Sequence, residues 1–430
     1  MPLPENITRA YTAILREELL VAMGCTEPIA IAYAASILRK TLGTEPERIQ
    51  ARLSGNIIKN VKSVIVPATG GLHGIEAAIA AGVVSGHPEK RLEVLAALKP
   101  GDQEKIGCFL NRCRFTIAEM ESANTFDLEL SATAGEQTAT VRISKNHTNV
   151  EHVSKNGEDW TDAFFCAMQE DEPKRTDRSV LNVKDIITYA DEVALDTVRS
   201  LLEQQMTMNV AIAEEGLKGN YGANIGRVLN CNGEASLRDR ARAYAAAGSD
   251  ARMSGCEMPV CIISGSGNQG ITASVPVAVY AKELGISHET LLRALIVSDL
   301  ITIHQKTGIG CLSAYCGAIS AGCGCAAGIC YLQGGKYYEI AHTLVNAVAI
   351  LSGTICDGAK PSCAAKIAMA VEAGIMGYEM MKAGQQFLGG EGIVTKGVEN
   401  TIRNIGRLAR DGMSETDKEI IRIMLGSTGC

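Results

Sequence analysis

Asp127-Leu128-Glu129-Leu130-Ser131 and Thr138-Ala139-Thr140-Val141-Arg142-Ile143 are the two stretches that decide how the chain is divided. Both alternate polar and apolar residues, which predicts strands with one face buried. Leu92-Glu93-Val94-Leu95 shows a similar alternation, and residues 103–112 between these strands have helical spacing. We therefore expect a small α+β insert over residues 91–177.

The rest of the chain has mainly helical periodicity, apart from a short alternating stretch at residues 51–65. Residues 5–43 predict two helices separated by Gly24-Cys25-Thr26-Glu27-Pro28, with Thr26 as the N-cap of the second. From residue 179 onward the pattern is helical, with glycine-rich breaks that include residues 308–335. The expected fold class is α+β, mainly α: a discontinuous helical catalytic domain over 1–90 and 178–430 carries the insert.

Composition restricts the classes of function. The chain has 430 residues, 46% of them hydrophobic and 21% charged, as in ordinary globular proteins. A net charge of -7 without a basic cluster argues against nucleic-acid binding. The start Met1-Pro2-Leu3-Pro4 lacks the features of a signal peptide, and the apolar segments are too short or too interrupted to span a membrane. We expect a cytoplasmic protein.

Fifteen cysteines are the most informative part of the composition. In a reducing cytosol, an odd number in a long chain argues against a disulfide framework. Seven of the cysteines lie between Cys311 and Cys363. Cysteines that only fill the core would be scattered, so this clustering indicates a metal site.

The cysteines of interest lie in the segments 310–322 and 356–363, beside glycines and a proline. Soft thiolates on flexible backbone suit an iron–sulfur cluster, and three such ligands would leave one iron open to a substrate. Two alternatives stay open at this point. Small cysteines can simply fill helix contacts, which we expect for Cys323, Cys325 and Cys330. A zinc site is the other alternative, although the spacing does not match common zinc patterns.

Three further segments are candidates for substrate chemistry. Cys25 precedes a predicted helix N-terminus, where amides and the helix dipole would stabilise a thiolate and make it a usable base. Ser264-Gly265-Ser266-Gly267-Asn268-Gln269-Gly270 predicts an anion-binding turn. This segment matches the dinucleotide fingerprint, but no βαβ unit follows it, so we reject that assignment. Asn56, Lys59 and Asn60 offer amides and an ammonium.

Several of these motifs together resemble the L-cysteine desulfidase family, which is related to the catalytic chain of iron–sulfur L-serine dehydratases. The motifs are Gly24–Pro28, Ser264–Gly270, Cys316-Gly317-Ala318, and Cys356-Asp357-Gly358-Ala359 with Cys363. The resemblance spans nearly the whole chain in the same order. The serine dehydratases have proline after Cys-Asp where this chain has Gly358, and their next cysteine comes later, which favours the desulfidase branch.

The resemblance implies a [4Fe-4S] cluster held by Cys316, Cys356 and Cys363, with Cys311 and Cys323 as competitors for the first position. It also implies that Cys25 accepts a proton and that the cluster acts as a Lewis acid. The expected reaction eliminates sulfide from L-cysteine and gives pyruvate and ammonia; elimination of water from L-serine is the alternative. Ser264, Ser266 and Asn268 of the glycine turn would hold the substrate carboxylate, with Asn56, Lys59 and Asn60 as further candidates.

Two other classes of protein are alternatives to an iron–sulfur lyase. An iron–sulfur sensor would need a DNA- or partner-binding surface, and the sequence offers no helix-turn-helix or basic patch. A pyridoxal-phosphate lyase would use a Schiff-base lysine instead of cysteines. The expected partner is a small amino-acid substrate, with no nucleic acid and no membrane, and a homodimer is the assembly considered. The terminal Cys430 is a candidate to cap the open iron.

Overall fold

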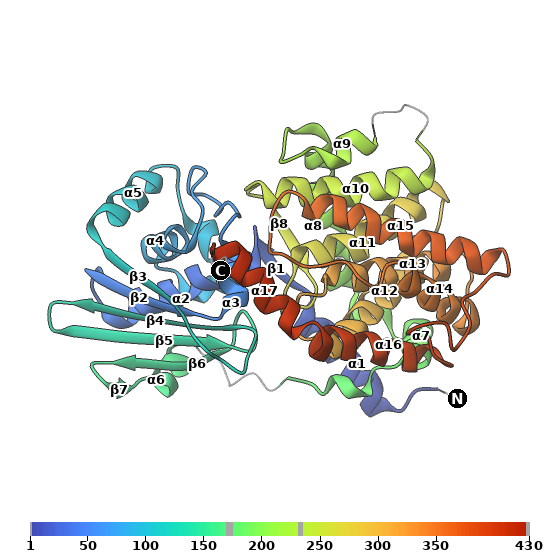
Figure 1. The fold of residues 1–430 in the computed structure, drawn as a ribbon, viewed down its shortest axis with the longest axis horizontal. Helices are drawn as coiled ribbons and strands as arrows, with labels where there is room; N and C mark the ends of the chain where they lie inside the picture. The colour runs from blue at the N-terminus through green and yellow to red at the C-terminus, as the bar shows by residue number, and fades with distance from the viewer. Residues whose placement is uncertain (1, 169–174, 231–234, 427–430) are drawn as a thin grey trace.

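The computed structural model describes residues 2–168, 175–230 and 235–426, which form two parts that lie side by side in Figure 1. The first, called the α/β part here, contains the strands β2 to β7 with the helices α2 to α6. The second, called the helical part, contains α1 and α7 to α17. Within these residues the fold is mainly helical with one mixed sheet, so the predicted fold class is confirmed.

The sheet of the α/β part has six strands in the order β3-β2-β4-β5-β6-β7. Only β2 and β3 pair in parallel; the other neighbours are antiparallel. The strands are β2 (Arg48–Leu53), β3 (Arg114–Glu119), β4 (Asp127–Ala134), β5 (Gln137–Ser144), β6 (Val150–Lys155) and β7 (Glu158–Asp159). The strands predicted at 127–131 and 138–143 are therefore confirmed as β4 and β5.

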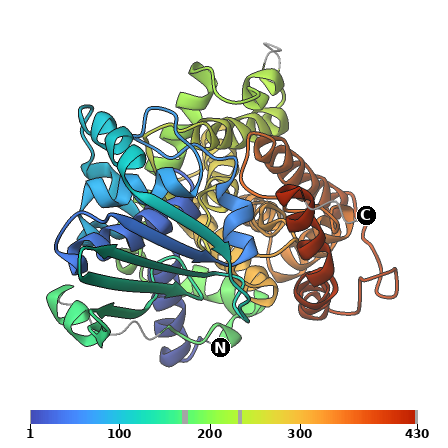
Figure 2. The same ribbon diagram turned by 60° about the vertical axis from the view of Figure 1, so that its left-hand side comes forward.

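One face of this sheet is buried by α2 (Thr26–Leu42). Along β2 the residues alternate between exposed and buried, because successive side chains of a strand point to opposite faces. Helix α4 (Ile75–Ser85) packs closely on α2: a Cβ at Gly82 would lie 2.1 Å from the carbonyl oxygen of Ala32. Figure 2 brings this part of the molecule forward, with the sheet in front of its helices.

The sheet reaches beyond the predicted insert of residues 91–177, because β2 lies between β3 and β4. The division of the chain into domains at residues 90 and 177 stays a prediction. The helix expected at 103–112 is confirmed as α5 (Asp102–Arg112). The strand expected at Leu92–Leu95 is wrong, since this stretch lies in the 3₁₀ segment η1 (Pro88–Ala97) and packs on α2. The remaining helices here are α3 (Gly55–Val61) and α6 (Thr161–Met168).

The helical part has a fully buried helix at its centre, α13 (Gly317–Leu332), which packs against α11, α12, α14 and α15. Every residue from Ala318 to Leu332 is buried, as expected for a helix that is apolar all round. The other helices are α1 (Glu5–Glu18), α7 (Val183–Glu192), α8 (Arg199–Lys218), α9 (Ile225–Leu229), α10 (Leu237–Met253), α11 (Gly267–Glu283), α12 (His288–Ile309), α14 (Tyr337–Ile350), α15 (Cys363–Lys382), α16 (Val398–Arg407) and α17 (Ser414–Leu425), with short turns η2 (Arg178–Val180), η3 (Leu195–Thr197) and η4 (Leu408–Gly412).

Small residues allow these helices to approach closely. A Cβ at Gly322 would lie 2.4 Å from the carbonyl oxygen of Ala370, and one at Gly324 would lie 2.1 Å from Thr302 Oγ1. The expectation that residues 308–335 form a glycine-rich break is therefore wrong for most of that range. The glycines there serve helix contact inside α13 rather than a turn.

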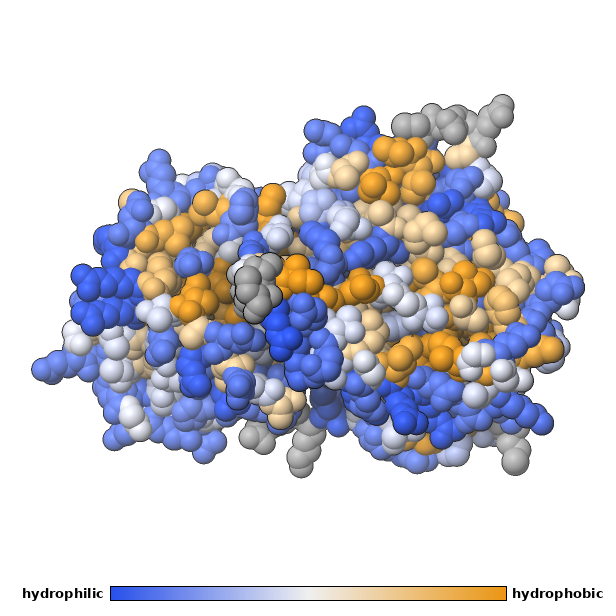
Figure 3. Space-filling model, viewed as in Figure 1, coloured by the Kyte–Doolittle hydropathy of each residue, from blue (hydrophilic) through white to orange (hydrophobic). Residues whose placement is uncertain are grey.

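Two features join the parts. The break between α1 and α2 contains a short strand, β1 (Leu20–Met23), which pairs antiparallel with β8 (Pro259–Ile262) just before the glycine turn at 264–267. At the other end of the chain, α17 crosses from the helical part to α3 of the α/β part (Figure 1). Figure 3 shows hydrophobic residues gathered beside the end of α17, near the middle of the face of the molecule that is drawn.

Candidate active site

A cavity of about 100 Å³ lies where the start of α2, the glycine turn before α11, the loop before α13 and the start of α15 meet. Most of the site residues proposed from the sequence line it: Cys25, Asn60, Ser264, Ser266, Asn268, Cys316, Cys356 and Cys363. Asn56 and Lys59 are not among the lining residues. Segments that are hundreds of residues apart in the sequence thus contribute to one site.

Backbone pairing brings the first two candidate ligands together. The chain around Tyr315 runs antiparallel to the chain around Ile355. The amide of Cys316 donates to the carbonyl oxygen of Thr354 at 3.1 Å, and the amide of Cys356 donates to that of Ala314 at 2.6 Å. Cys316 is also the N-cap of α13, and Cys363 is the first residue of α15.

The three thiols interact electrostatically. Burial, followed by the negative charge that Cys356 would carry, raises the pKa of the Cys316 thiol to about 12. The pKa of Cys363 is also raised, first by burial and then by Cys356, against the lowering effect of a Lys360 hydrogen bond. A thiolate at one of these positions makes it harder for its neighbour to ionise. A bound cation would offset this repulsion and stabilise the cysteines as thiolates.

The arrangement is not that of a single metal ion. Within the described part of the chain, no three His, Cys, Asp or Glu side chains come close enough together to hold one ion. The zinc alternative therefore has no preformed three-ligand group among these residues, since all ligands of one zinc ion lie about 2.0–2.3 Å from it.

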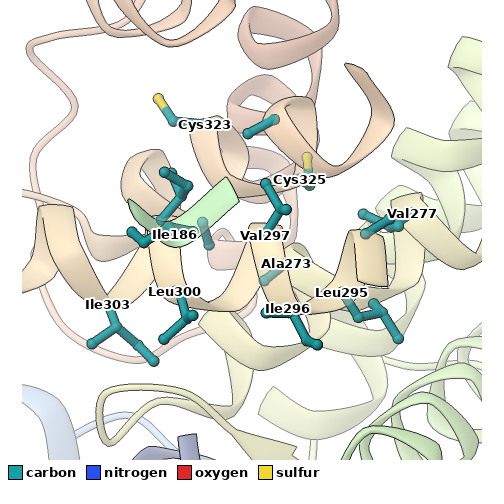
Figure 4. Packing of buried hydrophobic residues seen from close by; sticks show 14 of the residues in the cluster. Ile186, Ala273, Val277, Leu295, Ile296, Val297, Leu300, Ile303, Cys323 and Cys325 are labelled. Carbon is teal, nitrogen blue, oxygen red and sulfur yellow. The ribbon is translucent and has the colours of Figure 1, made fainter. Parts of the chain in front are cut away.

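The other cysteines of the cluster fall into two groups. Cys311 lines the same cavity, whereas Cys323, Cys325 and Cys330 are buried in the hydrophobic core of the helical part. Figure 4 shows Cys323 and Cys325 among the apolar side chains of that core. The packing role expected for these three is in agreement with their surroundings, and of the two competitors for the first ligand position only Cys311 lies at the cavity.

The loop that carries Cys356 is held by lysines. The Asp357 carboxylate pairs with both Lys360 and Lys366, and Lys366 also donates to the carbonyl oxygen of Ile355 at 2.8 Å. Burial opposes ionisation of Asp357, but the two lysines outweigh it and lower its pKa to about 2. Gly358 has φ +95, and a Cβ there would lie 2.4 Å from the Lys59 carbonyl oxygen. Proline cannot adopt that φ, which explains why glycine follows Cys-Asp in this chain.

Cys25 is the N-cap of α2, so the helix begins at Thr26 rather than being capped by it as expected. Thr26 Oγ1 instead donates to the carbonyl oxygen of Gly265 at 2.7 Å and so connects α2 to the glycine turn. The Cys25 side chain is buried and packs against Met253 and Cys363 in one small cluster. The proposed proton acceptor therefore lies beside a proposed ligand.

The expectation that the helix N-terminus lowers the pKa of Cys25 is wrong. Burial and the negative charge of Glu27 raise that pKa well above its ordinary value. Cys25 Sγ donates a hydrogen bond to Glu27 Oε2 at 3.1 Å. The thiol is therefore protonated near neutral pH.

Glu27 is a buried carboxylate that also accepts from Asn60 Nδ2 at 3.2 Å. Burial would raise its pKa, but His147 and the Cys25 thiol outweigh burial and lower the pKa to about 2. His147 Nε2 lies 3.8 Å from Glu27 Oε1, so the two side chains are close neighbours at more than the usual hydrogen-bond length. His147 comes from the loop between β5 and β6, so the α/β part also contributes to the site.

The glycine turn is shaped by unusual backbone angles. Ser264 has φ +49 and Gly265 has φ +77, and a Cβ at Gly265 would lie 2.6 Å from His147 Cε1. Ser266 caps α11 by accepting from the Gln269 amide, and Asn268 Oδ1 accepts from Arg252 Nη1 at 3.1 Å. Two of the polar groups that we expected to hold a substrate carboxylate thus already have protein partners.

Asn56 and Lys59 are engaged elsewhere. Lys59 Nζ lies 2.5 Å from Asp417 Oδ1 on α17, and Asn56 Nδ2 donates to Asp417 Oδ2 at 2.5 Å. Lys59 also donates to the carbonyl oxygen of Cys356 at 3.3 Å. These two residues tie the last helix to the cysteine loop, and only Asn60 of the three lies at the cavity.

Sequence reasoning missed several charged or titratable side chains that line the cavity, among them Glu27 as an acceptor, His147, Arg252 and Lys306. Burial lowers the pKa of Lys306, while Cys311 and Cys356 oppose that effect. A second, wider cavity of about 260 Å³ shares His147 and Lys306 with the first, so the two adjoin. Among these four, only Glu27 lay in a segment that the sequence singled out; the others have no motif around them.

By its fold and site the protein is a mainly helical protein with a cavity lined by thiols. Comparison with known proteins shows the family to which it belongs. The chain belongs to the serine dehydratase alpha chain family, whose model matches residues 89–422. The matched range includes Cys316, Cys356 and Cys363, whereas Cys25 precedes it. Membership relates the chain to lyases of the serine dehydratase type.

Similar proteins extend over the whole length. A UPF0597 protein from Desulfitobacterium hafniense is 55% identical over 97% of this chain and 96% of its own. UPF0597 proteins from Finegoldia magna and Treponema denticola are 46% and 44% identical, over 96% and 99% of this chain and 99% and 100% of theirs. Among the described residues, no helix is both long enough and apolar enough to cross a bilayer.

Proposed function

We propose that this protein is a [4Fe-4S]-dependent lyase that eliminates sulfide from L-cysteine and yields pyruvate, ammonia and hydrogen sulfide. The observation that carries the proposal is that Cys316, Cys356 and Cys363 line one cavity together with Cys25. The family supports a lyase related to serine dehydratases. We further propose that it acts in the cytoplasm and as a homodimer.

The donor set consists of thiols, which are the ligands of iron–sulfur clusters. In a cuboidal cluster each thiolate binds a different iron. The support for this assignment is that three cysteines line one cavity. Cys316, Cys356 and Cys363 would hold the cluster, with Cys311 as the alternative to Cys316. When bound, the cluster supplies a Lewis acid at the iron that has no protein thiolate.

The chain's own residues handle the proton. We assign removal of the α-proton to Cys25, whose thiol must first release its own proton. Glu27 Oε2 accepts a hydrogen bond from Cys25 Sγ at 3.1 Å and orients the thiol, while the thiol proton leaves to solvent because Glu27, with a pKa of about 2, stays ionised. The electron pair of the Cα–H bond then becomes the C=C bond while the Cβ–S bond breaks, and sulfide leaves with the pair of that bond. Water hydrolyses the released aminoacrylate to pyruvate and ammonia, so the reaction needs no oxidant or reductant.

The second candidate is elimination of water from L-serine at the same site. The observation that favours it is the family itself, whose description is the alpha chain of serine dehydratase. Both reactions remove the α-proton and a β-substituent, and they differ only in the group that leaves. The cavity residues proposed here would serve either substrate.

One experiment tests both candidates. The protein is purified without oxygen, iron and acid-labile sulfide are measured, and sulfide and pyruvate release are assayed on L-cysteine and L-serine. We expect about four irons and four labile sulfides per chain, as the cluster formula requires, with sulfide release from L-cysteine. Pyruvate from L-serine alone would select the dehydratase. Zinc without labile sulfide, or no product from either amino acid, would reject the proposal.

A further inference from the structure

Arg252 is a buried cation at the cavity that no step above uses. It lies in the last turn of α10 and is 2% exposed, yet it is one of the lining residues. Its neighbour Met253 packs against Cys25. A guanidinium is always charged, and taking it out of water is costly unless it is paired.

Only part of this guanidinium has a protein partner. Nη1 donates to Asn268 Oδ1 at 3.1 Å. Nε and Nη2 are buried and have no hydrogen-bond partner among the residues that the structure describes. Buried donors are nearly always paired, so two unpaired donors on one charged group indicate a ligand.

The two unpaired atoms lie on the same edge of the guanidinium. This edge, formed by Nε–H and one Nη–H, holds two parallel donors at the spacing of the two oxygens of a carboxylate. Asn268 binds the opposite nitrogen and so fixes the plane of the group. Gly267 lets the guanidinium lie close to the glycine turn, because a Cβ there would lie 2.3 Å from Arg252 Nε.

We propose that Arg252 binds the α-carboxylate of the substrate through its Nε and Nη2 edge, and that Asn268 is a positioning residue for it. This inference rests on the proposed function and names the group of the substrate that is recognised. The glycine turn then supports Arg252 instead of holding the carboxylate itself. The ionised Glu27 on the same cavity supplies the opposite charge, so the site fits a zwitterionic α-amino acid.

The test uses equilibrium binding to the anaerobically purified, iron-loaded protein, measured by titration calorimetry. The probes are L-alanine and L-alaninamide, which have no leaving group and differ at the carboxylate. L-alaninamide keeps one acceptor oxygen but loses one of the two charge-assisted hydrogen bonds, so it should bind about 30-fold more weakly than L-alanine. Arg252→Gln should lose L-alanine affinity by a similar factor, and Arg252→Lys should lose part of it, since an ammonium cannot bind both oxygens in parallel.

The matched control is Arg240→Gln on the same helix. Arg240 pairs with Glu283 and does not line this cavity, so L-alanine binding should be unchanged. Equal binding of the two probes to the unmodified protein, no binding of L-alanine, or wild-type affinity in Arg252→Gln would each overturn the inference. The first two results need no variant and stand even if Arg252→Gln does not fold. If Arg252→Gln loses the preference between the probes and the unmodified protein has no lyase activity, the carboxylate site is kept and the proposed function is rejected.

Discussion

Removing the Asp417 carboxylate should destabilise the protein by about 3–5 kcal/mol, the usual cost of breaking a buried ion pair from one side. The Lys59 side chain is 1% exposed and its Nζ lies 2.5 Å from Asp417 Oδ1. At that separation and an effective dielectric constant of 20, the attraction is about 7 kcal/mol. Asp417→Ala removes this attraction and leaves the Lys59 ammonium with its longer hydrogen bond to the Cys356 carbonyl oxygen, at 3.3 Å.

The assay is urea unfolding followed by circular dichroism and by fluorescence of Trp160, the single tryptophan of the sequence, which lies in the α/β part. Both signals should shift to lower urea, since α17 connects the two parts. Asp411→Ala is the matched control: its carboxylate pairs with Arg410 on the surface and should change nothing measurable. The double change Lys59→Met with Asp417→Leu should recover most of the loss. A midpoint for Asp417→Ala equal to that of the unmodified protein would refute the reasoning.

Three other predictions follow from the site. Cys356→Ser should abolish iron binding and lyase activity, whereas Cys325→Ser should change neither; full iron content in the first variant would contradict the ligand assignment. Cys25→Ser should keep iron and labile sulfide but lose turnover, since an alcohol is far harder to ionise than a thiol; a protein without iron would make Cys25 a ligand. Glu27→Gln should destabilise the protein at pH 7 by about 3 kcal/mol, because the folded pKa of about 2 lies below the ordinary 4.5. That difference is present above pH 4.5 and should shrink as pH falls toward 2; unfolding curves at pH 7 and pH 3 measure it, and a difference that grows in acid would disprove it.

The sequence predicted those elements that bury one face against a neighbour and leave the other face less buried. Strands β4 and β5 alternate because one face packs on α2 and the other does not, and that alternation is visible in the residues themselves. Leu92–Leu95 has a similar alternation, yet it forms a 3₁₀ segment, since packing against α2 outweighs so short a pattern. The buried helix α13 has no polar face, so its glycines were indistinguishable from those of a loop.

The candidate site was predictable where the chemistry is carried by rare residue types. Cysteines and a glycine-rich turn stand out in a sequence. Cys25, Cys316 and, from the turn, Ser264 are examples that line the cavity. Arg252 does not stand out, because α10 carries several arginines and only the fold shows which of them is buried at the cavity. Lys59 was misplaced for the converse reason: its partner Asp417 lies 358 residues away. The terminal Cys430 lies outside the described residues, so its proposed role as a cap stays a prediction.

The walls of the cavity come from both ends of the chain, with Cys25 near the start and Cys363 far along it. During synthesis at about 5–20 residues per second, some 20 to 70 seconds separate the appearance of these two residues. Throughout that interval Cys25 and Glu27 have no α15 to cover them, while α2 can already pack on the sheet, α4 and η1. We therefore expect the α/β part to fold first, while the chain is still on the ribosome and the site residues of this part are still uncovered. The site is expected to close only when the last third of the polypeptide folds against this part.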